Sequence, residues 1–232
     1  MTASTTLLSL AYKRFKRHKL ALASGLVLIV LTVLALGAPV AEAILGIAAD
    51  DVDLLARFSG PSASHPLGTD ELGRDFLIRL LYGGQVSLMV GMTAALAAAG
   101  LGTAVGLYAG YHGGRADAFL MRFTDGIISL PLLPLLIVLA ALDLEKVGIP
   151  DAIANSENVS LYRIILIVAL VGWTTVARLV RGAALSLRER DFVLAARSHG
   201  ASDLRIMGVH ILPNLVSPIV VATTLSVGNV IL

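Results

Sequence analysis

The chain of 232 residues is 56% hydrophobic and only 15% charged, with a mean hydropathy of +0.84. Because a soluble domain carries about 25% charged residues, this composition excludes a water-soluble globular protein and predicts a chain that lies in a bilayer. The formal net charge of +2 argues against a nucleic-acid-binding protein. The absence of cysteine excludes disulfides and thiolate metal sites.

Five apolar stretches are candidates for membrane spans. An α-helix rises about 1.5 Å per residue, so about 20 apolar residues cross a hydrocarbon core about 30 Å thick. The predicted spans lie near residues 20–44, 86–108, 125–142, 162–180 and 211–232. The third and fourth need flanking residues to reach that length, and the fifth runs into the last residue. The sequence therefore predicts an all-α fold, a polytopic transmembrane helical bundle of about five spans.

Basic and acidic residues alternate between the segments that connect these spans. Residues 1–19, 109–124 and 178–210 carry a surplus of Lys and Arg, whereas 45–85 and 143–161 carry a surplus of Asp and Glu. Basic residues accumulate in cytoplasmic loops, so the N-terminus is predicted to be cytoplasmic. The predicted organisation is a cytoplasmic N-terminal segment, residues 1–19, followed by a transmembrane domain, residues 20–232. The transmembrane domain includes an outer segment, residues 45–85, and a cytoplasmic loop, residues 181–210.

Small residues recur every fourth position along the second predicted span. The series comprises Ala94, Ala98, Gly102, Gly106, Gly110 and Gly114. This spacing places them on one helix face, where small side chains allow another helix to approach closely. Two interpretations remain open at this point, a helix-packing seam and a face that lines a translocation path.

The third predicted span opens with Asp125, close to Arg122 and to the membrane boundary. A carboxylate deep within a membrane is a functional candidate by default. The boundary position favours instead a partnered interfacial carboxylate over a proton relay.

The last basic loop predicts two short helices joined by a glycine turn. Asp191 can cap a helix that runs to His199, and Gly200 can adopt the left-handed conformation that ends it. Ser202 can cap a second helix through Val209, before Pro213 opens the fifth span. An apolar stripe of the first helix is predicted at Phe192, Ala195, Ala196 and His199. Because a helix this short is unstable alone, we expect it to dock on its own bundle or in a partner's groove.

This loop resembles the E-A-A-x3-G-x9-I-x-L-P signature of permease subunits of bacterial ATP-binding-cassette importers. The matching residues are Ala195, Ala196, Gly200, Leu212 and Pro213. Leu194 stands in place of Glu and His210 in place of Ile, departures that resemble the dipeptide, oligopeptide and nickel subfamily. Segments 65–88 and 110–131 are also similar to its C-type subunits, so the resemblance extends over most of residues 10–225.

The resemblance implies a type I importer permease fold and a coupling helix within residues 191–205 that sits in a groove of an ATPase subunit. The implied contact residues are Leu194, Ala195, Ala196, Arg197, Ser198, His199, Gly200, Ala201 and Asp203. His210, Leu212 and Pro213 complete the motif in a structural role. The alternative is that the loop only caps the fold at the membrane surface.

By the same resemblance, the chain is a multi-pass subunit of the bacterial cytoplasmic (inner) membrane. The implied partners are a homologous second permease, two ATPase subunits and an extracytoplasmic substrate-binding protein. ATP and magnesium are expected to be bound by the ATPase subunits, so no cofactor is expected in this chain. The substrate class is expected to be di- or oligopeptides, although relatives also carry nickel chelates, glutathione and some sugars.

The outer segment combines turn-forming and charged residues at Gly68, Asp70, Gly73, Arg74 and Asp75. Gly sets turns while the charges can pair with one another, which favours a folded surface cap. The alternative is a surface that meets substrate or a substrate-delivering protein.

No motif for catalysis or metal binding occurs in the sequence. A phosphate-cradling loop requires a Gly-Lys pair, and the chain contains none. H-E-x-x-H and other paired-histidine spacings are also absent. We therefore expect a subunit that is not an enzyme. Two alternative hypotheses remain. One is an ATP-independent transporter or channel, which would place polar residues within the spans. The other is a truncated nonfunctional permease copy, because the family has a sixth span.

Overall fold

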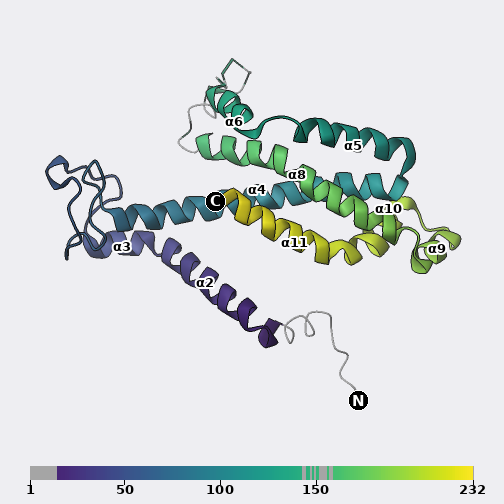
Figure 1. Cartoon of the computed structure of the whole chain (residues 1–232), viewed down its shortest axis with the longest axis horizontal. Helices are drawn as coiled ribbons and strands as arrows, with labels where there is room; N and C mark the ends of the chain where they lie inside the picture. The colour runs from purple at the N-terminus through teal and green to yellow at the C-terminus, as the bar shows by residue number, and fades with distance from the viewer. Residues whose placement is uncertain are drawn as a thin grey trace. The chain divides into compact units, whose positions relative to one another are not determined.

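The computed structural model describes residues 15–142, 145, 146, 148, 150, 151, 156 and 159–231. In these residues the secondary structure is helical, with no strand beyond an isolated bridge between Thr69 and Asp75. The all-α prediction is confirmed. The chain divides into two compact units, residues 1–88 and 89–232, and α4 continues from the first into the second (Figure 1).

The first unit contains α2 (Lys19–Leu36), α3 (Ala38–Leu45) and the short helix η1 (Leu54–Ala56). The predicted span 20–44 is thus two helices that meet at Gly37. Pro39 has no N–H to donate to the carbonyl of Ala35, and Gln85 Nε2 donates to that oxygen instead at 2.7 Å. The amide side chain therefore satisfies the backbone group that the proline leaves free.

The helix that contains the second predicted span is longer than predicted at both ends. α4 extends over Phe76–His112. It begins after Asp75, whose Oδ1 accepts the N–H of Ile78 at 2.9 Å as an N-cap does. It ends at Gly113, which has a φ of +66°. The first ten residues of α4 were included in the predicted outer segment.

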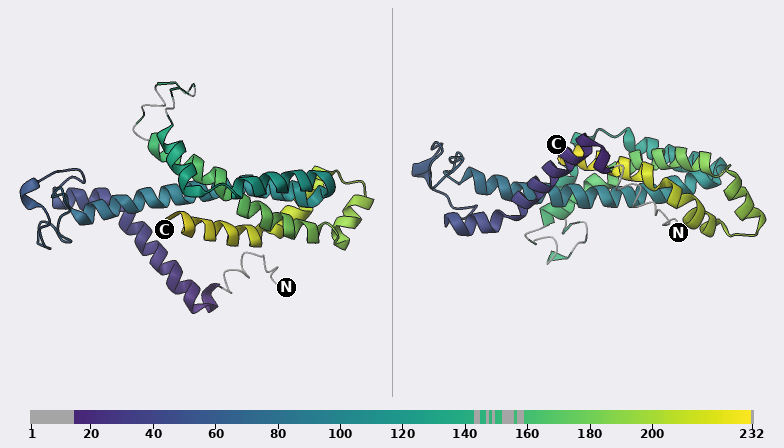
Figure 2. Two further views of the ribbon diagram at one scale, coloured as in Figure 1. Left: turned by 45° about the horizontal axis from the view of Figure 1, so that its top comes forward. Right: turned by 90° about the horizontal axis from the view of Figure 1, so that it is seen from below.

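The second unit is organised around α8 (Val159–Leu187), which packs against α5 (Gly114–Ile128), α6 (Leu132–Ala141) and α11 (Leu212–Ile231). Its buried core joins α4, α8, α9 and α11 through Leu107, Tyr111, Val176, Val180, Ala184, Val193, Ile206, Met207, Ile211, Leu215 and Ala222. The short α9 (Asp191–Ser198) lies at one end of this unit (Figures 1 and 2).

Four described helices are long and apolar enough to cross a membrane. They are Lys19–Leu36, Phe76–His112, Val159–Leu187 and Asp203–Ile231. The predicted span 125–142 is divided between α5 and α6, because Pro131 lacks an N–H and disfavours a helical conformation at Leu130. A span there remains a prediction. Most of the predicted loop 143–161 and of segment 1–19 lies outside the described residues.

Two ion pairs join α5 to α8. Arg181 makes a bidentate contact with Asp117, with Nη2 to Oδ2 at 2.6 Å. Arg178 pairs with Asp125. Asp125 is therefore a partnered carboxylate, and its partner is Arg178 rather than the Arg122 that the sequence indicated.

We expect the Arg181–Asp117 pair to stabilise the contact between α5 and α8. The two side chains are 35% and 13% exposed, so truncating either to alanine leaves a poorly solvated charge behind. A double-mutant cycle in detergent should give a coupling free energy of about 1–3 kcal/mol. The Arg178–Asp125 pair is the matched control, because its side chains are 50% and 59% exposed, and about 0–1 kcal/mol is expected there. Equal coupling in both pairs would contradict the prediction.

Candidate coupling site

α9 is a two-turn helix that ends in a left-handed glycine. Gly200 has a φ of +79°, as the sequence predicted. The N–H of Gly200 donates to Arg197 O at 2.9 Å, and the N–H of Ala201 donates to Ala196 O at 3.1 Å. These two bonds form a Schellman motif, which satisfies the last carbonyls of the helix. The chain therefore reverses sharply after α9.

The buried face of α9 differs from the predicted stripe. Val193 is fully buried and Ala196 packs partly against the same core, whereas Phe192, Ala195 and His199 are exposed. The packed positions are thus three residues apart, at Val193 and Ala196. Val193 was missed because the apolar residues of so short a segment fit more than one helical face.

Most of the predicted contact residues of α9 and its turn face outward. Those classed as exposed are Leu194, Ala195, Arg197, Ser198, His199, Gly200 and Asp203, while Ala196 and Ala201 are half-buried. Leu194 is 46% exposed and Leu204, just beyond the turn, is 79% exposed. The turn therefore presents a mixed apolar and charged surface.

The segment after the turn is one continuous helical element rather than a separate short helix. Ser202 occupies the cap position of α10 (Asp203–Arg205), but its side chain makes no capping hydrogen bond. A π-helical turn, η2 (Ile206–Ile211), then leads into α11. Because a proline ring clashes with the carbonyl four residues earlier in a regular α-helix, the wider π-turn directly before α11 accommodates Pro213. Of the motif residues, His210 and Leu212 are half-buried and Pro213 is exposed.

A cluster that the sequence did not predict ties α4 to this turn. The hydroxyl of Tyr111 donates to Asp203 Oδ1 at 2.6 Å, and Arg197 Nη2 donates to the Tyr111 oxygen at 3.1 Å. His112 Nε2 lies 3.8 Å from Asp203 Oδ2. The similarity of segment 110–131 drew attention to this stretch, but no local pattern singled out Tyr111.

Four residues of the small-residue series face α8, namely Ala98, Gly102, Gly106 and Gly110. Gly114 belongs to α5 instead, and no heavy atom lies within 4 Å of a Cβ there. A Cβ at Gly102 would lie 2.5 Å from the carbonyl oxygen of Trp173, and a Cβ at Gly110 would lie 2.7 Å from Cβ of Ala184. Ala98 is 2% exposed and packs with Trp173. At Gly106 the nearest atom would be a backbone oxygen of α8. The geometry at the three glycines is that of two helices in backbone contact.

The outer segment of the first unit is an interlocked turn structure. Asp70 accepts N–H bonds from Leu72 and Arg74 at 2.8 and 3.0 Å, and its Oδ2 accepts from Arg74 Nε at 2.8 Å. Desolvation alone would raise the pKa of Asp70, but the backbone N–H donors and the Arg74 guanidinium together hold that pKa below its usual value. Asp75 is fully buried and contacts His65 Nδ1 at 3.0 Å.

Both predicted glycines of this segment have positive φ, +78° at Gly68 and +76° at Gly73. A Cβ at Gly68 would collide with the backbone oxygen of Ser59, and one at Gly73 would collide with that of Asp53. The five predicted residues of the outer segment are thus part of one folded cap.

Comparison with known proteins identifies the family. Residues 102–232 match the family described as binding-protein-dependent transport system inner membrane component. Residues 6–45 match the N-terminal transmembrane domain of oligopeptide transport permease C. The chain belongs to this family of transport permeases.

Curated permeases of this family align along nearly the whole chain. The chain is 34% identical to the dipeptide transport system permease protein DppC of Alkalihalophilus pseudofirmus, over 96% of this chain and 67% of that protein. It is 35% identical to the oligopeptide transport system permease protein OppC of Mycobacterium tuberculosis, over 100% of this chain and 75% of that protein. It is 36% identical to DppC of Bacillus subtilis, over 94% of this chain and 62% of that protein. With four apolar helices, this permease is a multi-pass membrane protein.

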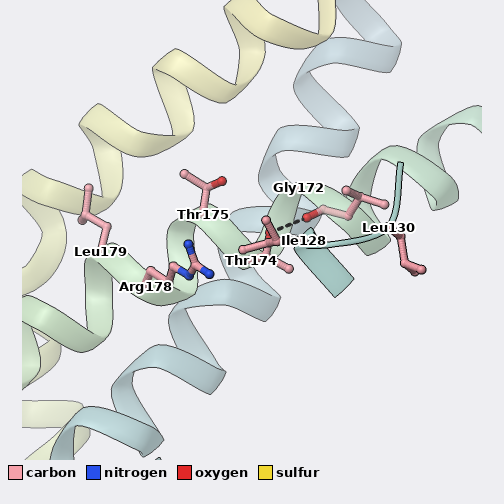
Figure 3. Close-up of a pocket in the computed structure, with 8 residues that line it drawn as sticks. Ile128, Leu130, Gly172, Thr174, Thr175, Arg178 and Leu179 are labelled. Carbon is pink, nitrogen blue, oxygen red and sulfur yellow. Dashed lines mark hydrogen bonds between the residues drawn. The ribbon is translucent and has the colours of Figure 1, made fainter. Parts of the chain in front are cut away.

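A cavity of the permease lies on the side of α8 that faces the link between α5 and α6. Figure 3 shows Ile128, Leu130, Thr175 and Arg178 among its lining residues. Thr175 and Arg178 are both exposed. Thr175 and Arg178 thus place polar groups beside this cavity within the candidate span Val159–Leu187.

Proposed function

We propose that the chain is the membrane-spanning permease subunit of an ATP-driven importer and that α9 with the Gly200 turn contacts an ATPase subunit. The observation that carries the proposal is the exposed short helix α9, anchored in the core by fully buried Val193 and closed by Gly200 in the left-handed conformation. A helix this short exposes most of its surface while Val193 anchors it to the core, which suits insertion into a groove of a partner.

The family supports a set of partners and a compartment. Its description refers to a binding protein and to the inner membrane. We infer an assembly with a second, homologous permease, two ATPase subunits and an extracytoplasmic substrate-binding protein, with the N-terminus in the cytoplasm. ATP and magnesium are bound by the ATPase subunits, and this chain is not itself an enzyme.

The substrate class inferred for this permease is di- or oligopeptides, because the relatives are named as dipeptide and oligopeptide transport proteins. Transport proceeds by alternating access, in which closure of the ATPase pair moves the α9 turn and reorients the helices packed on it. The outer segment, residues 45–85, faces the binding protein. Its folded cap is formed by Gly68, Asp70, Gly73, Arg74 and Asp75.

Changing Gly200 to valine tests the coupling role. A residue with a Cβ costs about 1–2 kcal/mol in the left-handed region, and a β-branched side chain costs more. No heavy atom lies within 4 Å of a Cβ at Gly200, so the cost is conformational rather than steric. We expect the stimulation of ATP hydrolysis by loaded binding protein, measured in the assembled complex, to fall about 10-fold or more.

Two variants control this measurement. Gly200→Asn should retain most of the stimulation, because Asn tolerates the left-handed conformation. Gly126→Val in α5 has open space around its Cβ and an ordinary φ, and full activity is expected. Undiminished stimulation in Gly200→Val would contradict the coupling role of the turn. If no ATPase subunit copurified with the wild type, an ATP-independent transporter would be favoured.

A further inference from the structure

The C-terminal end of α4 is joined to both sides of the Gly200 turn through a single hydroxyl group. Arg197 lies in α9, before the turn, and donates to the Tyr111 oxygen at 3.1 Å. Asp203 lies in α10, after the turn, and accepts from the same hydroxyl at 2.6 Å. We propose that Tyr111 is the positioning residue through which a displacement of the coupling turn reaches α4. This inference rests on the proposed function of the turn.

The ring of Tyr111 is packed tightly enough to pass a displacement of its hydroxyl to α4. Tyr111 is 4% exposed and belongs to the core cluster that contains Val180 and Val193. The guanidinium carbon of Arg197 lies 5.5 Å from the ring centroid, and the His112 ring stands edge-on to it at 5.1 Å. Coupling between distant sites is carried by packed side chains and hydrogen-bond networks of this kind. A shift at the Gly200 turn therefore displaces the Tyr111 side chain, which is packed in the core of the second unit.

The partners of the hydroxyl distinguish this contact from ordinary burial of a tyrosine. A buried hydroxyl needs one acceptor, which a backbone carbonyl commonly supplies. Here both partners are charged side chains on the exposed surface of the turn, and the Asp203 side chain is 60% exposed. A docked ATPase subunit can reach Arg197 and Asp203 directly. The Tyr111 hydroxyl therefore responds to the groups that the docked partner displaces.

The element that follows the turn extends this connection into the membrane. Asp203 begins the helix Asp203–Ile231, which contains the π-turn η2. π-turns inside α-helices are frequent at functional sites. Arg188, directly after the last residue of α8, donates to Gly110 O at 3.4 Å, next to Tyr111. The hydroxyl of Tyr111 thus joins α4 to α9 and α10, and Arg188 holds the adjacent residue of α4.

The test is Tyr111→Phe in the complete importer reconstituted in vesicles. The change removes the hydroxyl and keeps the ring in the core. A hydrogen bond to a charged group contributes about one to two powers of ten to an equilibrium, so we expect substrate transported per ATP hydrolysed to fall about 10-fold. Copurification of the ATPase subunits and hydrolysis without binding protein should stay at wild-type levels. Asp203→Asn, which keeps an acceptor oxygen, should retain more coupling than Asp203→Ala.

Tyr108→Phe is the matched control. Tyr108 lies on the same helix, is 48% exposed and contacts the His112 ring at 4.3 Å between centroids, and wild-type coupling is expected. Combining Tyr111→Phe with Asp203→Ala should lower coupling by less than the product of the two single effects, because both changes remove the Tyr111–Asp203 bond.

Three results would overturn the inference. The first is wild-type transport per ATP in Tyr111→Phe. The second is a parallel loss of complex yield, basal hydrolysis and stimulated hydrolysis, which indicates a purely structural role. The third is a wild-type complex without an ATPase or without stimulation, in which case the proposed function fails as well. A stimulated wild type with an unaffected Tyr111→Phe variant is the signature of failure of this inference alone.

Discussion

Replacing Gly106 by leucine is expected to destabilise the second unit by about 3 kcal/mol or more. A Cβ at this position would lie against the backbone oxygen of Ala177, closer than real contacts allow, and 3.0 Å from Cβ of Val180. Overpacking of a well-packed interior costs about 1–3 kcal/mol and sometimes more. Backbone atoms of α8 cannot rotate out of the way as a side chain can, so the upper part of that range applies.

The measurement is thermal unfolding of the detergent-solubilised protein, followed by loss of the monodisperse peak on size-exclusion chromatography. Gly100→Leu is the matched control on the same helix, because nothing lies within 4 Å of a Cβ there and the residue is exposed. We expect this control to be neutral or slightly stabilising, since leucine has the higher helix propensity. Equal unfolding temperatures for the two variants would show that α4 and α8 are not in backbone contact at Gly106.

The second large effect is expected from Gly73→Ala in the outer segment. Gly73 has a φ of +76°, and a Cβ there would overlap the backbone oxygen of Asp53. The conformational strain alone costs about 1–2 kcal/mol, and the overlap forces residues 53 and 73 apart. We expect the outer cap to open while the helices of the second unit stay folded.

Hydrogen–deuterium exchange of residues 53–75 measures this opening directly. Amides that exchange slowly in the wild type should exchange faster by about two powers of ten, the factor that corresponds to about 3 kcal/mol. Gly60→Ala is the matched control in the same segment, because its Cβ has open space and its φ lies outside the left-handed region. Unchanged protection in Gly73→Ala would contradict the tight approach of the two backbone segments.

Several features of the fold depend only on residues that lie close together in the sequence. Gly200 followed from a short helical pattern that needs a left-handed residue at its end, and the structure has φ +79° there. The spacing of Gly102, Gly106 and Gly110 indicated a face that another helix can approach. These inferences succeed because they depend on residues within a few positions of one another.

Other features depend on segments that are far apart in the sequence. Tyr111 and Asp203 are 92 positions apart, and no local pattern connects them. Asp125 pairs with Arg178 although Arg122 is nearer along the chain. Ion pairs and buried hydroxyls select partners by geometry, which only the packing of the helices supplies.

The sequence by itself determined that the chain lies in a membrane, that it is helical and that it carries the motif of its permease family. These properties follow from composition, periodicity and short motifs, which are set by covalent neighbours. Only the tertiary structure decided that α9 buries Val193 rather than Phe192, that α4 meets α8 through its glycines and that Tyr111 joins both sides of the Gly200 turn. These properties follow from close packing, because a side chain is buried or paired only by the segments that fold against it.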